Sequence, residues 1–293
     1  MLLLAITAIF TFQGVLSSDV CSVPEKTSPR SHNYTSVLSL TRKTQIAFND
    51  LPGFTRSVYY RDHALITPES RVWAGQPGWT NTVTSHLISP ASGANFAMYL
   101  ADLKTESAAG APAPGAERFI LVVEGEVTVT TSDGRSVDLR HNDYAYFPPH
   151  DSGKITSATG SGLLIYERMY NLKGKPEFFN GHVEGSPLLP TPGEVFELRK
   201  LIPQTADYDF NIHVMDFKPG EHLFVKEVHY NQHGLMMLEG QGIYRLGDNW
   251  YPVQSGDVVW MAPFVPQWYA ALGTTPTRYI IYKDTTVDPL MSR

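Results

Sequence analysis

Short apolar stretches separated by turn residues run through most of the chain. The stretches are rich in β-branched and aromatic residues, as in Val127–Thr130 and Ile243–Leu246, and Gly, Asp and Asn close them. Closely spaced strands with such turns are typical of antiparallel sandwiches and barrels. Helical periodicity is weak, apart from one possible helical turn near Glu194–Leu201. The pattern therefore predicts an all-β fold.

The same order of strands and turns occurs twice. Val122–Gly125 starts a series that ends in Asn142–Pro149, and Met237–Gly240 starts a matching series that ends in Gly256–Pro263. The two series lie 115 residues apart at their start and 114 residues apart at their aspartates. A duplicated unit with a slip of one residue predicts two β-barrels in tandem.

The N-terminus is apolar and carries no charged residue before Asp19. A stretch of this length, followed by small residues, fits a secretory signal peptide in residues 1–18, with a short hydrophobic anchor as the alternative. In the secretory pathway, Asn33–Thr35 is a usable glycosylation sequon. Cys21 is the only cysteine, which excludes a disulfide within the chain.

Composition divides the rest of the chain into four segments. Residues 19–50 are polar and rich in Ser and Thr, and they are expected to form an N-terminal arm. The first barrel is expected in residues 51–170 and the second in residues 206–293. Between them, residues 171–205 carry several prolines and phenylalanines, which favours a packed connector.

Charge and composition exclude several classes of protein. Apolar residues make up 42% of the chain and charged residues 18%, as in globular domains and unlike disordered chains. The net charge of −6, without a Lys/Arg cluster, offers no surface for nucleic acid. No membrane contact is expected after removal of the signal peptide, so the expected partner is a small-molecule substrate.

Four residues of the second repeat carry the clearest chemical signal: Glu227, His229, His233 and Gln267. Glu227 and His229 are two apart and share one face of a strand. A turn at Asn231–Gln232 can return His233 to the same place. A carboxylate, two imidazoles and an amide oxygen suit a first-row transition metal, and the hard oxygens favour Mn or Fe(II). The alternative is a group of ordinary polar residues on a barrel rim.

The first repeat lacks this set of ligands. At a separation of 115 residues, its matching positions hold Pro112, Pro114 and Arg118. The fourth position holds Ser152 or Gly153. Proline and arginine side chains have no lone pair for a cation. The first barrel is therefore expected to bind no metal and to serve as a scaffold for the second.

The second repeat resembles the two motifs of the cupin superfamily, here doubled as a bicupin. Gly220 and Gly240 bracket the first motif, and Gln267 stands eleven residues after Gly256, where the second motif ends. The usual His/His/Glu/His ligand set of cupins is rearranged to Glu/His/His/Gln in this chain.

This rearrangement, together with Leu51–Tyr59, Arg61–Ser70 and Gly240–Gln254, resembles the family of plant (S)-ureidoglycine aminohydrolases from about Leu51 to Asp284. The resemblance implies two cupin barrels of the jelly-roll (double-stranded β-helix) type and a Mn²⁺-dependent homo-oligomer of the endoplasmic reticulum. It also implies an enzyme of ureide (purine) catabolism. The implied reaction is hydrolytic deamination of (S)-ureidoglycine to (S)-ureidoglycolate and ammonia.

The resemblance also implies a substrate pocket beside the metal. Tyr279 and Lys283 lie four residues apart in a strand-like segment, so they share a face. The resemblance implies a pocket that uses a Tyr and a Lys of this strand, so Tyr279 and Lys283 are expected to act in catalysis, together with Glu227. Substrate contacts are expected from the same three residues and also from Gln267 and from Tyr244 of an earlier strand.

Three alternatives remain open. Lys283 can be a solvated strand end paired with Asp284. The chain can be a different metal-cupin enzyme, such as a dioxygenase or an oxalate-degrading enzyme, although these usually keep the His/His/Glu/His set. It can also be a non-enzymatic storage or ligand-binding bicupin, although storage cupins generally lose their ligands. Five further histidines are interpreted as structural: His63, His86, His182, His213 and His222.

Overall fold

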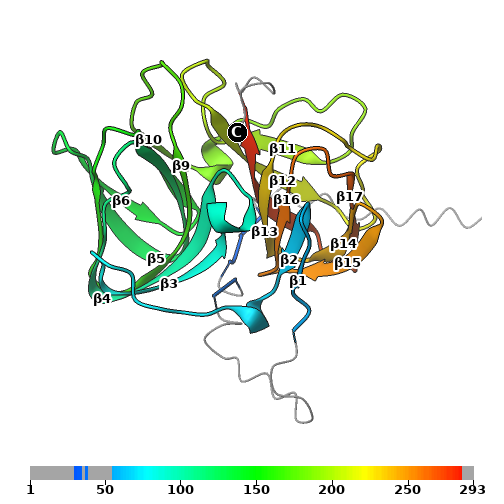
Figure 1. Ribbon diagram of the computed structural model, residues 1–293, viewed down its shortest axis with the longest axis horizontal. Coiled ribbons are helices and arrows are strands. Elements are labelled where there is room, and N and C mark those ends of the chain that lie inside the picture. The colour runs from blue at the N-terminus through cyan, green and yellow to red at the C-terminus, as the bar shows by residue number, and fades with distance from the viewer. Residues whose placement is uncertain (1–29, 35–36, 39–54, 286–293) are drawn as a thin grey trace, which may run out of the picture. The chain divides into compact units, whose positions relative to one another are not determined.

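The computed structural model describes residues 30–34, 37–38 and 55–285, which Figure 1 draws as a coloured ribbon. The chain divides into two compact units, Met1–His32 and Asn33–Arg293, and all the strands belong to the second unit. The predicted signal peptide and Cys21 lie outside the described residues. Within the part that is described, no helix is long and apolar enough to cross a membrane.

The first barrel is an antiparallel 8-stranded sheet that closes on itself. Its strand order is β10-β7-β5-β8-β4-β3, and β6 lies beside β5. Both β8 and β9 pair with β4 and with β5, which completes the closure. The strands are β3 (Thr80–Ile88), β4 (Ala97–Ala109), β5 (Ala116–Thr130), β6 (Ser136–Arg140), β7 (Asp143–Phe147), β8 (Lys154–Ser157), β9 (Ser161–Met169) and β10 (Phe179–His182).

The second barrel combines a 7-stranded sheet with a 3-stranded sheet. The larger sheet has the order β1-β2-β16-β13-β18-β12-β11 and the smaller one β15-β14-β17. The strands are β1 (Val58–Tyr59), β2 (His63–Ile66), β11 (Glu197–Lys200), β12 (Phe210–Phe217), β13 (His233–Glu239), β14 (Gln241–Leu246), β15 (Asn249–Gln254), β16 (Val258–Met261), β17 (Gln267–Leu272) and β18 (Thr277–Asp284). Three 3₁₀ helices connect strands: η1 (Pro68–Ser70), η2 (Pro90–Ser92) and η3 (Val183–Gly185).

The prediction of an all-β fold with two barrels is confirmed, but the prediction of a helical turn near Glu194–Leu201 is wrong. This segment contains strand β11, which pairs antiparallel with β12. Phe196 and Leu198 lie two residues apart and both pack against the core of the second barrel. Their spacing is that of a strand with one buried face.

The second barrel takes two strands from the start of the chain. Strand β2 pairs with β16, and β1 pairs with β2. Figure 1 shows these two strands in blue beside the orange strands of the second barrel. Residues 51–170 were expected to form the first barrel, so the sheets do not follow the chain order at this point. The segment boundaries themselves stay a prediction.

The side chains of strand β18 alternate between two hydrophobic cores. Tyr279 and Ile281 pack inside the second barrel, whereas Ile280 and Tyr282 belong to a core that both barrels share. Residues two apart point the same way on a strand. The predicted inward face of this strand therefore extends to Lys283, which lines the same cavity as Tyr279 and Ile281.

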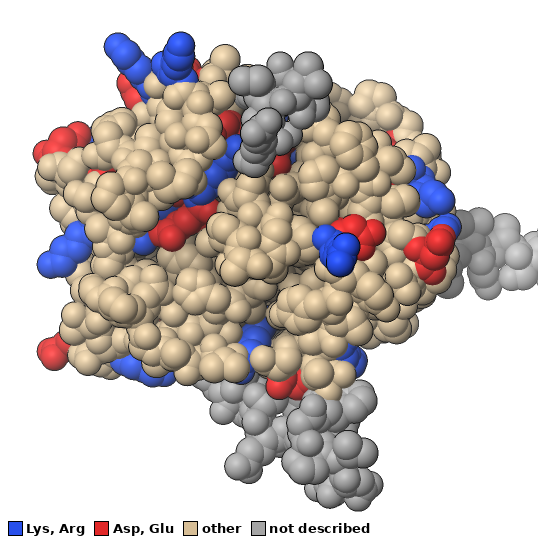
Figure 2. Space-filling model, in the orientation of Figure 1, with Lys and Arg blue, Asp and Glu red and all other residues tan. Residues whose placement is uncertain are grey.

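The face of the molecule in Figure 2 is mostly uncharged, and the acidic and basic side chains on it are scattered without a continuous basic area. Such a face offers a polyanion no extended cationic track. The expectation that nucleic acid is not a partner stays a prediction.

A buried arginine joins the barrels. Arg168, at the end of β9 in the first barrel, donates from Nη1 to Asp284 of β18 at 2.7 Å and to the Tyr282 hydroxyl at 2.8 Å. Its Nε lies 3.3 Å from Asp209. The suggested pairing of Lys283 with Asp284 is therefore wrong. Asp284 faces the first barrel, because alternation places it opposite to Lys283.

Arg168→Met is expected to lower the free energy of unfolding by about 3–5 kcal/mol, because it leaves buried carboxylates without a cation. The melting temperature should fall by about 10 °C. The matched control is Arg140→Met, which removes the exposed Arg140–Glu126 pair in the same barrel. Exposed pairs contribute about 0–1 kcal/mol. Equal melting temperatures of the two variants would show that Arg168 contributes no more than a surface charge.

Candidate metal centre

The predicted ligands are brought together by one pair of backbone hydrogen bonds. The Glu227 N–H donates to the Gln267 carbonyl at 2.9 Å, and the Gln267 N–H donates to the Glu227 carbonyl at 3.0 Å. The two residues thus form an antiparallel β-bridge. Residues directly opposite in such a bridge point to the same side. Glu227 and Gln267, forty positions apart in the sequence, therefore present their side chains to one point.

The two histidines reach this point from neighbouring backbone. His233 opens strand β13, where it lies opposite Met261 and Lys283. His229 lies in the loop before β13, and its carbonyl accepts a 2.8 Å hydrogen bond from the Phe264 N–H. The predicted turn between the two histidines is thus held at both ends.

His229 is the centre of the cluster. Its Nε2 lies 3.3 Å from His233 Nε2, 2.9 Å from the side-chain amide of Gln267 and 3.6 Å from Glu227 Oε2. A divalent ion with bonds of about 2.1 Å holds neighbouring donors about 3 Å apart. In the described part of the chain, no three His, Cys, Asp or Glu side chains already converge as a ligand group. Instead, each of the other three side chains contacts His229, and one of them, Gln267, is an amide.

The protonation states suit metal ligands. His233 Nδ1–H donates to the Tyr282 carbonyl at 3.0 Å, which leaves a lone pair on Nε2. Burial, with Lys283 beside it, holds the pKa of His233 well below its ordinary value, so the ring is neutral. The neighbouring His229 imidazole lowers the pKa of Glu227, which keeps the carboxylate charged. A ligating histidine fixed by a backbone carbonyl is the usual arrangement in metal sites.

Gln267 completes the donor set. Its Oε1 is buried and has no hydrogen-bond partner in the described residues. Its side-chain nitrogen faces His229 at 2.9 Å, and a half-turn of the amide exchanges the two atoms. The oxygen would then face the point where the two imidazoles and the carboxylate meet. The four residues therefore fit a divalent ion with mixed nitrogen and oxygen ligands.

A cavity of about 230 Å³ opens beside this cluster. It brings together five of the predicted site residues that the sequence scatters over 57 positions, namely Glu227, Tyr244, Gln267, Tyr279 and Lys283. The wall also includes His233 and the apolar side chains of Phe196, Leu198, Met215, Leu223 and Ile281. The four candidate ligands thus lie at the edge of a small chamber whose wall mixes apolar side chains with polar and charged ones. Such a chamber is typical of a small-molecule site.

The two tyrosines of the wall act as neutral groups. Burial raises the pKa of Tyr244 and of Tyr279 above the ordinary value, with Glu227 contributing to both shifts. Each phenol can therefore donate a hydrogen bond at neutral pH. Burial lowers the pKa of Lys283, and Glu227 opposes this shift.

Two residues of the wall were missed in the sequence analysis. Lys200 and His213 line the cavity, and they lie opposite each other in the pairing of β11 with β12. Burial, together with Lys200 and Lys283, lowers the pKa of His213 to about 3. The signal available in the sequence was the spacing of His213 and Met215, which lie two residues apart and therefore share a face of β12. It could not be used without knowing that β12 lies beside β18.

The other histidines interpreted as structural make local contacts. His63 lies between Asp62 and the Tyr251 hydroxyl, each at 2.8 Å. His182 contacts Asp143 at 2.6 Å. These contacts involve none of the four candidate ligands.

In the first barrel, the position equivalent to a candidate ligand holds an arginine. Arg118 takes the position that His233 holds in the second barrel. It is buried, and it donates to Glu167 at 2.6 Å and to the Gly110 carbonyl at 2.8 Å. A guanidinium group there is satisfied by the protein itself and offers no donor to a cation.

Known families match each of the two barrels, and known proteins match most of the chain. The family model described as "Cupin domain" matches residues 213–282, and the model described as "EutQ-like cupin domain" matches residues 98–160. The (S)-ureidoglycine aminohydrolase of Arabidopsis thaliana is 60% identical over 243 residues, which cover 82% of each chain. The (S)-ureidoglycine aminohydrolase of Escherichia coli (strain K12) is 30% identical over 82% of this chain and 94% of its own length.

A solved structure agrees with these relatives. The crystal structure of protein Ylba from E. coli superposes with a TM-score of 0.71 at 28% identity, over 80% of this chain and 96% of its own. The predicted resemblance to bicupins is confirmed. The chain belongs to the cupin superfamily as a bicupin and, within it, to the (S)-ureidoglycine aminohydrolase family.

Proposed function

We propose that this chain hydrolyses (S)-ureidoglycine to (S)-ureidoglycolate and ammonia with a Mn²⁺ ion held by Glu227, His229, His233 and Gln267. Relatives at 60% and 30% identity carry the name of this activity. One structural observation supports the proposal most. The four candidate ligands meet at the edge of the small cavity whose wall contains Tyr244, Tyr279 and Lys283.

The donor set favours manganese over softer ions. Two imidazoles, a carboxylate and a neutral amide oxygen make a site without thiolate, and hard oxygen donors suit Mn. When bound, a divalent ion supplies Lewis acidity and orients a compact polar substrate through two of its atoms.

The chain's own groups provide the proton transfers. The reaction replaces a C–N bond by a C–O bond from water, and one proton of the water must reach the departing nitrogen. The Glu227 carboxylate can accept a proton from water, and the Lys283 ammonium can donate one to the amine. Each of these two groups shifts the pKa of the other, so their charges act on each other across the cavity.

The remaining wall residues orient the substrate. Tyr244 and Tyr279 can donate hydrogen bonds to the ureido carbonyl, since both phenols are neutral and buried. The apolar side chains of Leu198, Met215 and Ile281 limit the water that enters the cavity. Exclusion of bulk water strengthens polar contacts inside such a site.

Location and assembly belong to the same proposal. An apolar N-terminus supports removal of residues 1–18 and residence in the endoplasmic reticulum. The family resemblance supports a homo-oligomer. N-terminal sequencing of the mature protein and its mass in solution would test these two points separately from catalysis.

The activity is tested by ammonia release from freshly prepared ureidoglycine, with and without added Mn²⁺, after removal of metal by a chelator. We expect release only with metal, and we expect (S)-ureidoglycolate as the chiral product. Oxalate and dioxygenase substrates serve as controls for other metal-cupin chemistry. Ammonia release that is unchanged in the chelated protein would contradict the metal assignment, and no release at all would contradict the activity.

Metal analysis is expected to give about one divalent ion per chain. The second barrel offers a full donor set, whereas Arg118 replaces a ligand in the first barrel. Plasma emission spectroscopy on the purified chain measures this ratio. Two ions per chain would contradict the interpretation of the first barrel as a scaffold.

A further inference from the structure

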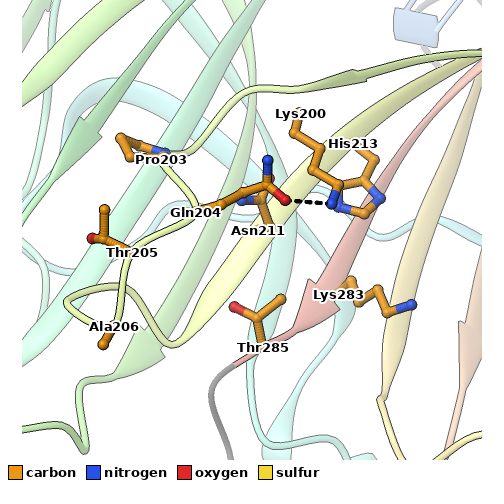
Figure 3. Close-up of a pocket in the computed structure, with 9 residues that line it drawn as sticks. All are labelled: Lys200, Pro203, Gln204, Thr205, Ala206, Asn211, His213, Lys283 and Thr285. Carbon is orange, nitrogen blue, oxygen red and sulfur yellow. Dashed lines mark hydrogen bonds between the residues drawn. The ribbon is translucent and has the colours of Figure 1, made fainter. Parts of the chain in front are cut away.

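A second cavity lies behind the first and shares part of its wall. This outer chamber has a volume of about 340 Å³. Figure 3 shows the residues that line it: Lys200, Pro203, Gln204, Thr205, Ala206, Asn211, His213, Lys283 and Thr285. Three of them, Lys200, His213 and Lys283, also line the cavity beside the metal cluster. The shared wall therefore consists of two lysines and one histidine.

Neither lysine of this wall forms a salt bridge within the described part of the chain. Lys200 Nζ donates to the neutral Gln204 Oε1 at 2.6 Å, the contact drawn as a dashed line in Figure 3. Among residues 30–34, 37–38 and 55–285, no carboxylate forms a salt bridge with Lys200 or with Lys283. The buried arginines differ, because Arg118 and Arg168 are each paired with a carboxylate.

His213 adds no further charge to this wall. The ring is neutral, since burial and the two lysines lower its pKa to about 3. Its Nε2 and the Oδ1 of the neighbouring Asn211 are buried without a hydrogen-bond partner in the described residues. The wall thus combines two cations with two unpaired polar atoms. Such a combination favours a small anion that carries its own hydrogen-bonding groups.

We propose that Lys200 binds the carboxylate of the substrate at this wall, and that it makes the enzyme specific for anionic ureido compounds. The inference rests on the proposed function only for the identity of the ligand. A ureido acid bound there places its carboxylate against Lys200 and its amine beside Lys283. Its amine and ureido group then extend towards the metal cluster, on the side of Glu227 and Gln267.

The position of Lys200 suits this role. It ends strand β11, and its Cα lies opposite that of His213 in the pairing with β12. The next residues, Leu201 and Ile202, are buried and fix the end of the strand. The contact with Gln204 restrains the long side chain before an anion arrives, which reduces the entropy lost on binding.

The test compares two ligands on the full-length, Mn²⁺-loaded chain by isothermal titration calorimetry. N-carbamoylglycine has the ureido group and the carboxylate but no amine, so it is not deaminated. N-carbamoylglycinamide is identical except that a neutral amide replaces the carboxylate. Lys200→Met should weaken binding of the acid by about 10-fold or more, the scale of one charge-assisted hydrogen bond. It should leave binding of the amide unchanged.

Two further variants separate charge from structure. Lys200→Arg keeps the cation and should bind the acid within about threefold of wild type, since guanidinium also pairs with carboxylate. Lys218→Met removes an exposed lysine just after β12 and should leave the binding of both ligands unchanged. Metal content and melting temperature are measured for each variant. If Lys200→Met does not fold, Lys200→Gln is used in its place.

The outcomes distinguish this inference from the proposed function. Equal weakening of acid and amide, or no weakening of either, overturns the carboxylate site even if the wild-type chain releases ammonia. Selective weakening of the acid supports the site even if no ammonia is released. With ureidoglycine as substrate, the Lys200→Met variant should show a raised KM with a smaller change in kcat, because the carboxylate is held in both ground and transition states.

Discussion

His233→Ala is expected to remove both the metal and the activity. His233 is almost fully buried, its Nδ1–H is fixed on a backbone carbonyl, and its Nε2 lone pair faces His229. Loss of a residue that merely orients a ligand costs about 10–100-fold in metal affinity, so loss of the ligand itself should cost more. Manganese is among the weakest-bound first-row ions, which leaves little affinity in reserve.

The measurement is metal content after dialysis, together with the electron paramagnetic resonance signal of bound Mn²⁺ and the melting temperature of the metal-free protein. His86→Ala is the matched control, because His86 is an exposed histidine of the first barrel. The control should keep its metal. A His233→Ala variant that retains about one tightly bound Mn²⁺ per chain would show that the ion binds elsewhere.

The candidate ligands could be predicted from the sequence because they depend on local geometry. Glu227 and His229 stand two residues apart, and His233 follows after four more. The predicted strand under the first two is wrong, because Glu227 forms only an isolated bridge and His229 lies in a loop, yet the short spacing keeps the three together. Gln267 required the repeat and the family resemblance. Its actual placement depends on the backbone bridge to Glu227, and no local pattern specifies a pairing between residues so far apart.

The residues that were missed depend on strand order. Lys200 and His213 reach the cavity because β11 and β12 form the edge of the sheet beside β18. Alternation along one strand indicates which residues share a face, but not which strand lies next to it. For the same reason, the sequence did not indicate that β1 and β2 join the second barrel.

The first barrel supports the metal site through the same kind of long-range contact. Asp284, held by Arg168, accepts hydrogen bonds from the Gln232 N–H at 3.3 Å and from Asn95 Nδ2 at 3.1 Å. Asn231 Nδ2 donates to the Asp284 carbonyl at 2.5 Å. The turn between His229 and His233 is thus fixed from the first barrel. A scaffold barrel without metal ligands can therefore still determine the geometry of the ligands in its twin.

Lys283→Met is expected to lower turnover by about 10²-fold or more, the usual scale for loss of a general acid or base. Lys283 lies on the inward face of β18 with Tyr279, lines the cavity, and has no carboxylate partner among the described residues. Burial lowers the pKa of its ammonium group, and this brings proton release closer to neutral pH. Methionine has a similar length and no charge, so packing beside Ile281 should be kept.

Metal content and melting temperature of Lys283→Met should stay near wild type, because Lys283 is not one of the candidate ligands and its ammonium group pairs with no other side chain of the described chain. Lys218→Met, at an exposed position, is the matched control and should retain full activity. Initial rates over a range of ureidoglycine concentrations separate two roles for Lys283. A loss confined to KM would assign it to carboxylate binding, which acts equally in ground and transition states, and a loss in kcat would assign it to proton transfer. Wild-type kcat/KM in this variant would remove Lys283 from the mechanism altogether.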